Sequence, residues 1–271
     1  DTIFDTIWDC VIVDEAHEGT TTALGEETVS AVVKNELGKT KLLALSGTPF
    51  NILADYDDKS IYTWDYIMEQ EKKTEWDKYH FGDSNPYEEL PALKIFTYNL
   101  GELMRKPDYI TYEDKAFNFR EFFRTWTGDM SYDYIPMPSE AHVGNFVHEQ
   151  DVWSFLNLMT HEDDNSNYPF SKEKYRKLFH HTLWMIPGVR EAKALKALMQ
   201  KHPVFGLFNI VNVAGNDDEE SSDALESVRN AINDAGDSGY TITLSCGKLT
   251  TGVTVKEWTG VFMLAGSYST S

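Results

Sequence analysis

The stretch CVIVDEAH, residues 10–17, is an apolar run that leads directly into two carboxylates and a histidine. A short apolar run of this kind is typical of a strand that is buried on both faces of a parallel sheet. Carboxylates are costly to bury, so Asp14 and Glu15 are expected at the open carboxyl edge of that sheet. Ligands of open α/β sheets bind at this edge. The stretch therefore predicts a parallel α/β fold with a polar site where the strand ends.

A second strand of the same kind is predicted a short distance along the chain. Residues 25–37 have the apolar spacing of a helix, and Gly38 is a typical helix stop. Residues 41–45 are again apolar and run into the hydroxyls of Ser46 and Thr48. Strand, helix and strand in this order form the unit of a parallel sheet. Both polar strand ends are therefore expected on one edge.

The middle of the chain has a different character. Helices are predicted over 61–79, 117–123 and 152–159, and a strand over 93–100. From residue 104 to about 180 the sequence is rich in aromatic and acidic residues and has no strand–helix alternation. This region is expected to be mainly helical, with its aromatic side chains in a core rather than in a ligand site.

Strand–helix alternation returns near residue 182. Strands are predicted over 183–186, 205–213, 240–245 and 260–264, and helices over 189–200 and 222–235. This pattern indicates a second parallel sheet. The chain is therefore divided into the second half of one α/β lobe, a helical insert or linker, and the first part of another lobe, over residues 1–104, 105–180 and 181–271.

Composition narrows the class of protein. The 271 residues carry a formal net charge of −20, which argues against a broad basic surface for nucleic acid but does not exclude a local groove. The two cysteines, Cys10 and Cys246, lie in apolar runs, so a reduced cytoplasmic protein is expected. No segment approaches the roughly 20 apolar residues of a membrane span, and no signal peptide is recognised. The missing initiator Met indicates a piece of a longer protein.

These segments resemble a known family. Residues 13–17 resemble motif II, the Walker B motif, of superfamily-2 DEAH-type helicases and translocases, and residues 44–50 resemble their motif III as found in restriction-enzyme motor subunits. Residues 183–198 and 245–255 lie where motifs IV and V are expected. Shorter patterns are similar to the Res subunit of type III restriction enzymes, at 62–66, 85–87 and 181–184. The resemblance covers most of the chain.

The resemblance implies two partial RecA-like lobes of the P-loop NTPase type, joined by the helical insert. It also implies ATP and Mg²⁺ as cofactors of the full-length parent. Asp14 would hold Mg²⁺ on the nucleotide phosphates, and Glu15 would orient or deprotonate the attacking water. His17 would belong to the catalytic set with these two acids and would also couple the nucleotide state to the grip on nucleic acid.

Two further motifs are assigned roles by the same resemblance. In motif III, Ser46, Gly47 and Thr48 would couple the nucleotide state to the grip on nucleic acid. In motif V, the contacts to nucleotide or nucleic-acid phosphates would come from Thr250, Thr251 and Gly252. The expected activity of the parent is ATP-driven movement along duplex DNA. Expected partners are DNA and methylase or specificity domains or subunits, with no membrane.

Two other functions are considered for the chain, an inert interaction module and a metal-dependent nuclease. The phosphate-binding P-loop is expected before residue 1 and the arginine finger after residue 271, so the chain alone is expected to be inactive. It could then serve as a catalytically inert RecA-like interaction module. A metal-dependent nuclease built on Asp14 and Glu15 would need further acids or a lysine on a neighbouring strand, and the sequence has no such constellation. A Gly-rich loop ending in Gly-Lys-Thr or Gly-Lys-Ser upstream would favour the motor.

Overall fold

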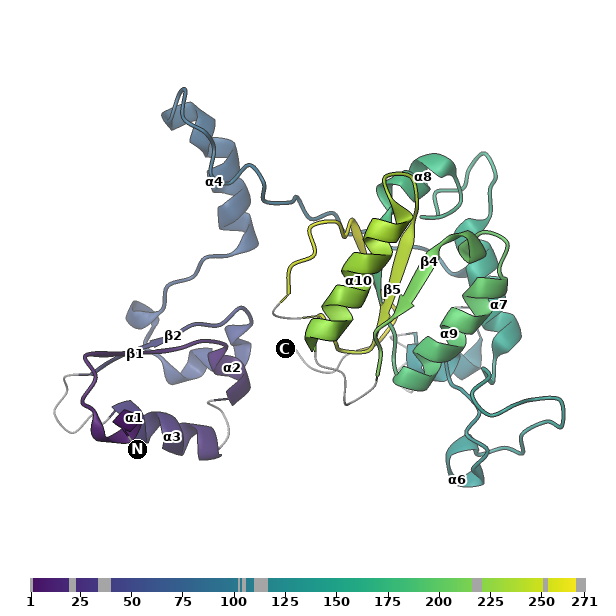
Figure 1. Cartoon of the computed structure of the whole chain (residues 1–271), viewed down its shortest axis with the longest axis horizontal. Coiled ribbons are helices and arrows are strands. Elements are labelled where there is room, and N and C mark those ends of the chain that lie inside the picture. The colour runs from purple at the N-terminus through teal and green to yellow at the C-terminus, as the bar shows by residue number, and fades with distance from the viewer. Residues whose placement is uncertain are drawn as a thin grey trace. The chain divides into compact units, whose positions relative to one another are not determined.

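A computed structural model describes residues 2–19, 23–33, 40–101, 103, 106–109, 117–215, 221–250 and 253–266. The chain divides into two compact units. The first unit contains residues 1–95 and the second contains residues 96–266. Both contain parallel strands and helices, which confirms the predicted α/β class (Figure 1). Among the described residues, no helix is long and apolar enough to span a bilayer.

The first unit is built on one pair of strands, β1 (Cys10–Val13) and β2 (Lys41–Ala44). The strands pair in parallel, with Val13 opposite Ala44. The helices of this unit are α1 (Thr2–Asp5), α2 (Ala16–Gly19), α3 (Ala23–Val33) and α4 (Tyr66–Tyr79). Three short 3-10 turns follow β2, at Pro49–Asn51, Leu53–Asp55 and Asp58–Ser60.

Two predictions for residues 1–104 are wrong. The strand at residues 10–13 is not buried on both faces, since the side chain of Ile12 is 62% exposed. The reason is that β1 has only β2 as a neighbouring strand among the described residues, which is too little to cover it. Residues 93–100 form no strand, and the N–H of Leu93 donates to the hydroxyl of Tyr66 instead of to a strand. Alternation of apolar residues cannot make a strand without a backbone partner.

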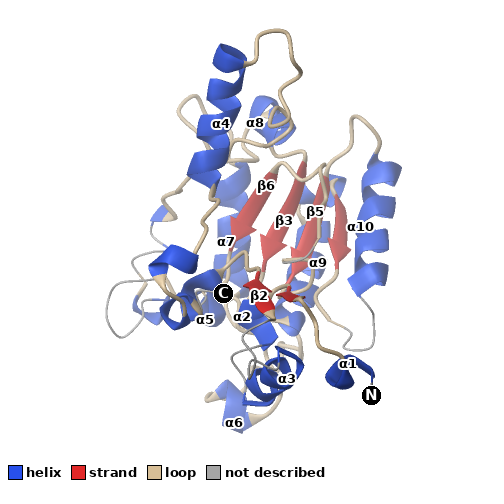
Figure 2. Cartoon of the chain, turned by 90° about the vertical axis from the view of Figure 1, so that its left-hand side faces the viewer, coloured by secondary structure: helices blue, strands red, loops and turns tan. Residues whose placement is uncertain are grey.

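The second unit has a four-stranded parallel sheet in the order β4-β5-β3-β6. These strands span Asn209–Asn212 (β4), Thr241–Ser245 (β5), His181–Met185 (β3) and Gly260–Met263 (β6). Two crossover helices connect them, α9 (Val189–Lys201) and α10 (Ser221–Ala235). The first half of the predicted strand 205–213 is instead a 3-10 turn, Phe205–Leu207. Figure 2 shows the strands of the sheet side by side.

The two crossover helices lie on opposite sides of this sheet (Figure 1). The chain moves from β3 outward to β4 and then back to β5. Because both parallel crossovers are right-handed, this reversal places the two helices on opposite faces. The apolar side chains accordingly form two clusters, with Leu195 of α9 in the larger one and Val228 of α10 in the smaller one.

The aromatic segment predicted as an insert packs into the larger cluster. Its helices are α5 (Phe119–Phe122), α6 (Met130–Asp133), α7 (Glu149–Thr160) and α8 (Glu173–Leu178). Phe122 and Phe155 are fully buried in this cluster. The ring of Phe170 lies 5.8 Å from Trp184 of β3 and 5.4 Å from Phe262 of β6. The described part of the aromatic segment and the sheet therefore share one core.

Removing Phe170 tests this shared core. Phe170→Ala should lower the free energy of unfolding of the second unit by about 3–5 kcal/mol, because it leaves a large cavity among aromatic rings. Urea unfolding followed by tryptophan fluorescence and by far-UV circular dichroism measures this change. Phe81→Ala, at a fully exposed ring of the first unit, is the control and should change little. A loss below about 1 kcal/mol for Phe170→Ala would contradict the shared core.

Two buried histidines predict a pH dependence of the second unit. Burial lowers the pKa of His202, and burial together with the neighbouring His180 lowers the pKa of His181, both below the ordinary 6.5. The unfolded chain therefore takes up protons before the folded chain does, and stability should fall as the pH drops below about 6.5. Carboxylates such as Glu121, whose pKa is lowered, contribute only at more acidic pH.

Chemical unfolding of the whole chain at about pH 7.5 and about pH 5.5 measures this loss. His181→Gln should reduce the difference in stability between the two conditions, since glutamine does not titrate. His142→Gln, at an exposed histidine, is the matched control and should leave the difference unchanged. An equal difference in all three proteins would rule out this role of His181.

Candidate functional site

The chain leaves β1 and β2 at the same edge of the first sheet, as the sequence predicts. Backbone pairing continues past the strands, because the N–H of Leu45 donates to Val13 O at 2.8 Å and the N–H of Ala16 donates to Leu45 O at 2.9 Å. These two bonds hold the loop after β2 against the start of α2. The two polar segments predicted as motifs II and III therefore lie next to each other.

The two acids lie at an abrupt turn between β1 and α2. Glu15 has a positive φ of 48°, a left-handed conformation that is uncommon for a residue other than glycine. Its N–H donates to Asp14 Oδ1 at 3.0 Å, which stabilises the turn. Both acids are exposed, so their carboxylates can reach a ligand outside the sheet. Backbone strain of about 1–3 kcal/mol is frequent where a side chain must be held for function.

His17 connects this turn to the loop after β2. His17 is only 8% exposed, and the Nδ1 of its imidazole lies 2.8 Å from Ser46 Oγ. The same nitrogen lies 3.5 Å from Glu15 Oε2. Ser46 Oγ also accepts a hydrogen bond from the N–H of Thr48 at 3.2 Å. The buried ring of His17 therefore links Glu15 to the 46–48 loop, so a movement of either one can shift the other.

Asn51 completes this connection and was not predicted from the sequence. Its Nδ2 donates to His17 O at 3.2 Å, so the turn after β2 is tied to the backbone of α2 as well as to the histidine ring. Only its position, shortly after Ser46, could have pointed to it. Thr48 is placed differently, since its Oγ1 is buried and has no hydrogen-bond partner among the described residues. A buried hydroxyl without a partner is destabilising, so a hydrogen bond from an incoming group would lower the free energy of that state.

The metal-binding capacity of this edge is limited. Within the described ranges, no group of three or more His, Cys, Asp or Glu side chains could hold a metal ion. Magnesium at nucleotide sites uses one or two carboxylates together with phosphates and water. The exposed carboxylate of Asp14 suits that kind of site and does not suit a metal cage built by protein alone. A Cβ added at Gly47 would meet no atom within 4 Å, so there is room on that side of the loop.

The predicted motif V residues belong to the second unit. Thr250 Oγ1 donates to Gly247 O at 2.7 Å, and Ser245 Oγ donates to Lys248 O at 2.5 Å, so this loop is closed on itself. Leu249 has a positive φ of 62° and a buried side chain. The other two predicted residues, Thr251 and Gly252, lie outside the described part of the chain.

The chain is similar to a protein of Mycoplasma pneumoniae with the provisional name type II restriction enzyme and methyltransferase RM.MpnORF110P, C-terminus. The two are 28% identical over 240 residues, and the match covers 83% of this chain. The same match covers 32% of that protein, so the chain spans about a third of its length. No protein-family model matches the chain, and no solved structure matches it.

Ser46→Ala tests the connection between the two loops. Alanine removes the acceptor of the Thr48 N–H, so amide hydrogen exchange at Thr48 should become about fivefold faster, as expected for the loss of about 1 kcal/mol. Nuclear magnetic resonance of the whole chain measures this rate. The control is Ser60→Ala, because Ser60 Oγ donates to Asp57 O in a separate turn of the same unit. Unchanged exchange at Thr48 would show that the hydroxyl of Ser46 does not hold this loop.

Proposed function

We propose that the chain is part of the ATP-dependent DNA translocase or helicase motor of a restriction–modification enzyme. The observation that carries the proposal is the 2.8 Å contact between His17 Nδ1 and Ser46 Oγ. This contact joins the segment that resembles the DEAH motif to the segment that resembles motif III, at one edge of a parallel sheet. A motor needs such a connection, because nucleotide hydrolysis must alter a neighbouring loop to produce movement.

The similarity to the Mycoplasma pneumoniae protein supports the restriction–modification assignment. That protein is named as a restriction enzyme and a methyltransferase and is about three times longer than the matched region. A motor segment within a longer polypeptide that also carries cleavage and methylation functions fits this arrangement. The finer assignment to the Res subunit of type III enzymes rests on the short sequence patterns described above.

In the proposed reaction, this chain supplies the side chains around the γ-phosphate. Asp14 would hold Mg²⁺, which neutralises charge on the phosphates when it is bound. Glu15 would orient the attacking water and accept its proton, because the turn places its exposed side chain next to Asp14. His17 would keep Glu15 in reach through the 3.5 Å contact with Nδ1. The phosphate cradle and the arginine finger would come from elsewhere in the parent.

Coupling would run through the loop after β2. When Glu15 moves with the nucleotide state, His17 can exchange one partner for the other, because Ser46 and Glu15 both lie near the same ring nitrogen. The buried hydroxyl of Thr48 would then find a partner in one of the two states. In the second unit, the proposed contacts to nucleotide or nucleic-acid phosphates are those of Thr250, Thr251 and Gly252.

DNA is the proposed substrate of the parent, and methylase or specificity domains are its proposed partners. The charge of −20 means that this chain contributes little general attraction to phosphates, so other parts of the parent would supply most of it. The same charge favours the second candidate function, a catalytically inert interaction module. The two candidates differ in whether the acids of the β1 turn are needed for ATP hydrolysis.

The isolated chain should not hydrolyse ATP above the rate of its own Glu15→Gln variant, because its sequence contains no P-loop motif and the resemblance assigns it no arginine finger. A phosphate-release assay with Mg²⁺ and ATP, with and without duplex DNA, measures this. Turnover of the unchanged chain clearly above that of Glu15→Gln would contradict the proposed division of the active site.

In the full-length parent, Glu15→Gln should lower kcat for ATP about 10²–10⁴-fold with a smaller effect on nucleotide affinity, since it removes only the base. Glu71→Gln on α4, in the same unit, is the matched control and should retain activity. An inert-module role predicts equal rates for the parent and both variants. That outcome would overturn the motor assignment.

A further inference from the structure

A finger of residues 126–145 projects from the second unit and carries α6 at its tip (Figure 1). Its two arms pair at the base, where the N–H of Trp126 donates to Asn145 O at 2.9 Å and the N–H of Gly144 donates to Trp126 O at 2.8 Å. Just beyond them, Thr125 forms an antiparallel bridge with Phe146. The base of the finger is therefore fixed to the core.

The tip of the finger is held by one buried carboxylate. Asp133 is almost fully buried and accepts hydrogen bonds from the N–H and hydroxyl of Thr127 and from the N–H of Gly128, at 2.8–2.9 Å. These bonds lower the pKa of Asp133 against the effect of its burial, so it stays charged. Arg124 donates to the backbone oxygen of Asp133 at 3.2 Å. A loop organised in this way loses little conformational entropy on binding a partner.

The tip presents apolar and aromatic side chains to solvent. Tyr134 is 79% exposed, Tyr132 is 65% exposed and Met130 is 57% exposed. Ile135 and Val143 extend the same exposed set. Single exposed apolar residues are ordinary, but five within this one ordered finger are typical of a contact surface. Tyrosine is also among the residues that dominate binding energy at protein interfaces.

The charged side chains of this region are mostly acidic. Residues 125–151 contain five carboxylates and no Lys or Arg. Asp133 is used within the finger, and Asp151 is paired with Lys106 at 2.5 Å. The remaining three are Asp129, Glu140 and Glu149. The surface is therefore acidic as well as apolar.

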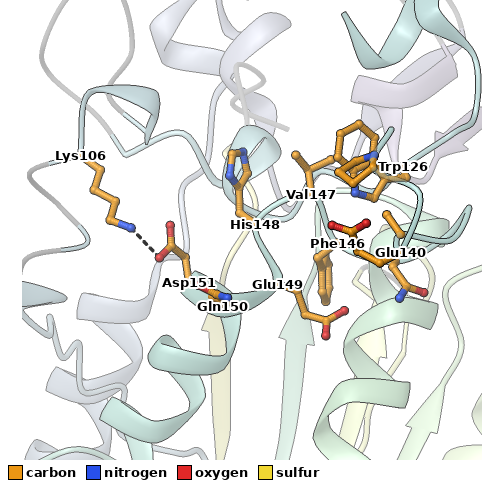
Figure 3. Close-up of a pocket in the computed structure, with 12 residues that line it drawn as sticks. Lys106, Trp126, Glu140, Phe146, Val147, His148, Glu149, Gln150 and Asp151 are labelled. Carbon is orange, nitrogen blue, oxygen red and sulfur yellow. Dashed lines mark hydrogen bonds and ion pairs between the residues drawn. The ribbon is translucent and has the colours of Figure 1, made fainter. Parts of the chain in front are cut away.

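A cleft of about 490 Å³ lies at the root of the finger, between its returning arm and the start of α7. Its lining includes Trp126 and Phe146 together with Glu140 and Glu149. Figure 3 shows these four on one side of the cleft and the pair of Lys106 with Asp151 on the other. Trp126 and Phe146 are each only 4% exposed, whereas Glu140 and Glu149 are exposed, and two exposed carboxylates provide a favourable site for a cationic side chain.

We propose that the finger and the cleft at its root form a docking surface for a protein segment that combines apolar side chains with Lys or Arg. The apolar side chains would cover the tyrosines of the tip, and a cationic side chain would enter the cleft between Glu140 and Glu149. Nucleic acid fits poorly, since residues 125–151 offer no Lys or Arg for phosphates. A second copy of the chain fits poorly too, because both surfaces would be acidic.

Selection from a random peptide library displayed on phage tests the proposal, with the whole chain as the target. The finger variant Tyr132→Ser/Tyr134→Ser is used for counter-selection. Enriched peptides are then synthesised, and their affinities are measured by fluorescence anisotropy. Labelled single-stranded and duplex DNA are measured in parallel. A second variant, Glu140→Gln/Glu149→Gln, tests the charge without altering the tip.

The controls are Leu207→Ser and Glu162→Gln, at an exposed apolar residue and an exposed acid elsewhere in the second unit. The expected peptides combine Lys or Arg with apolar residues, bind each double variant about tenfold or more weakly, and bind both controls as they bind the unchanged chain. Three results would each overturn the proposal: no peptide that distinguishes the finger variant, selected peptides without Lys or Arg, or DNA binding that depends on the finger. Thermal unfolding of every variant confirms that it is folded.

Discussion

The parallel pairing of β1 with β2 is the constraint on which the candidate site depends. Parallel strands end at the same edge, so the residues that follow each strand meet there even though 29 positions separate His17 from Ser46. A slip of one residue would turn every side chain of a strand to the other face and would move one loop along the edge. The two backbone bonds made by Leu45 and Ala16 beyond the strands hold the register at this edge.

The two units secure their shape in different ways. In the second unit, aromatic side chains from both the helical segment and the sheet fill one core, with Trp184 and Phe170 near its centre. This core supports the finger of residues 126–145, and the hydrogen bonds to the buried carboxylate of Asp133 order that finger. In the first unit, apolar side chains of the strands such as Ile12 stay exposed, and local hydrogen bonds at the strand ends organise the chain.

The sequence predicted the elements whose signals are local. Apolar runs that end in acids or hydroxyls gave the strands at residues 10–13 and 41–44 and the polar edge between them. Features that depend on contacts between segments distant in the sequence could not be predicted from local sequence patterns. The exposure of Ile12 and the absence of a strand at 93–100 were determined by the strands available to pair. The contact of Asn51 with His17 O and the shared core of the aromatic segment arise only when distant segments meet.

In the proposed motor, the ring of His17 and the hydroxyl of Ser46 would transmit the nucleotide state to the grip on DNA. The most direct measurement is the ratio of DNA-stimulated to basal ATPase activity in the full-length parent carrying Ser46→Ala, compared with Ser60→Ala. Basal hydrolysis should persist while the ratio falls fivefold or more, in line with a coupling free energy of about 1 kcal/mol or above. An unchanged ratio for Ser46→Ala would contradict it.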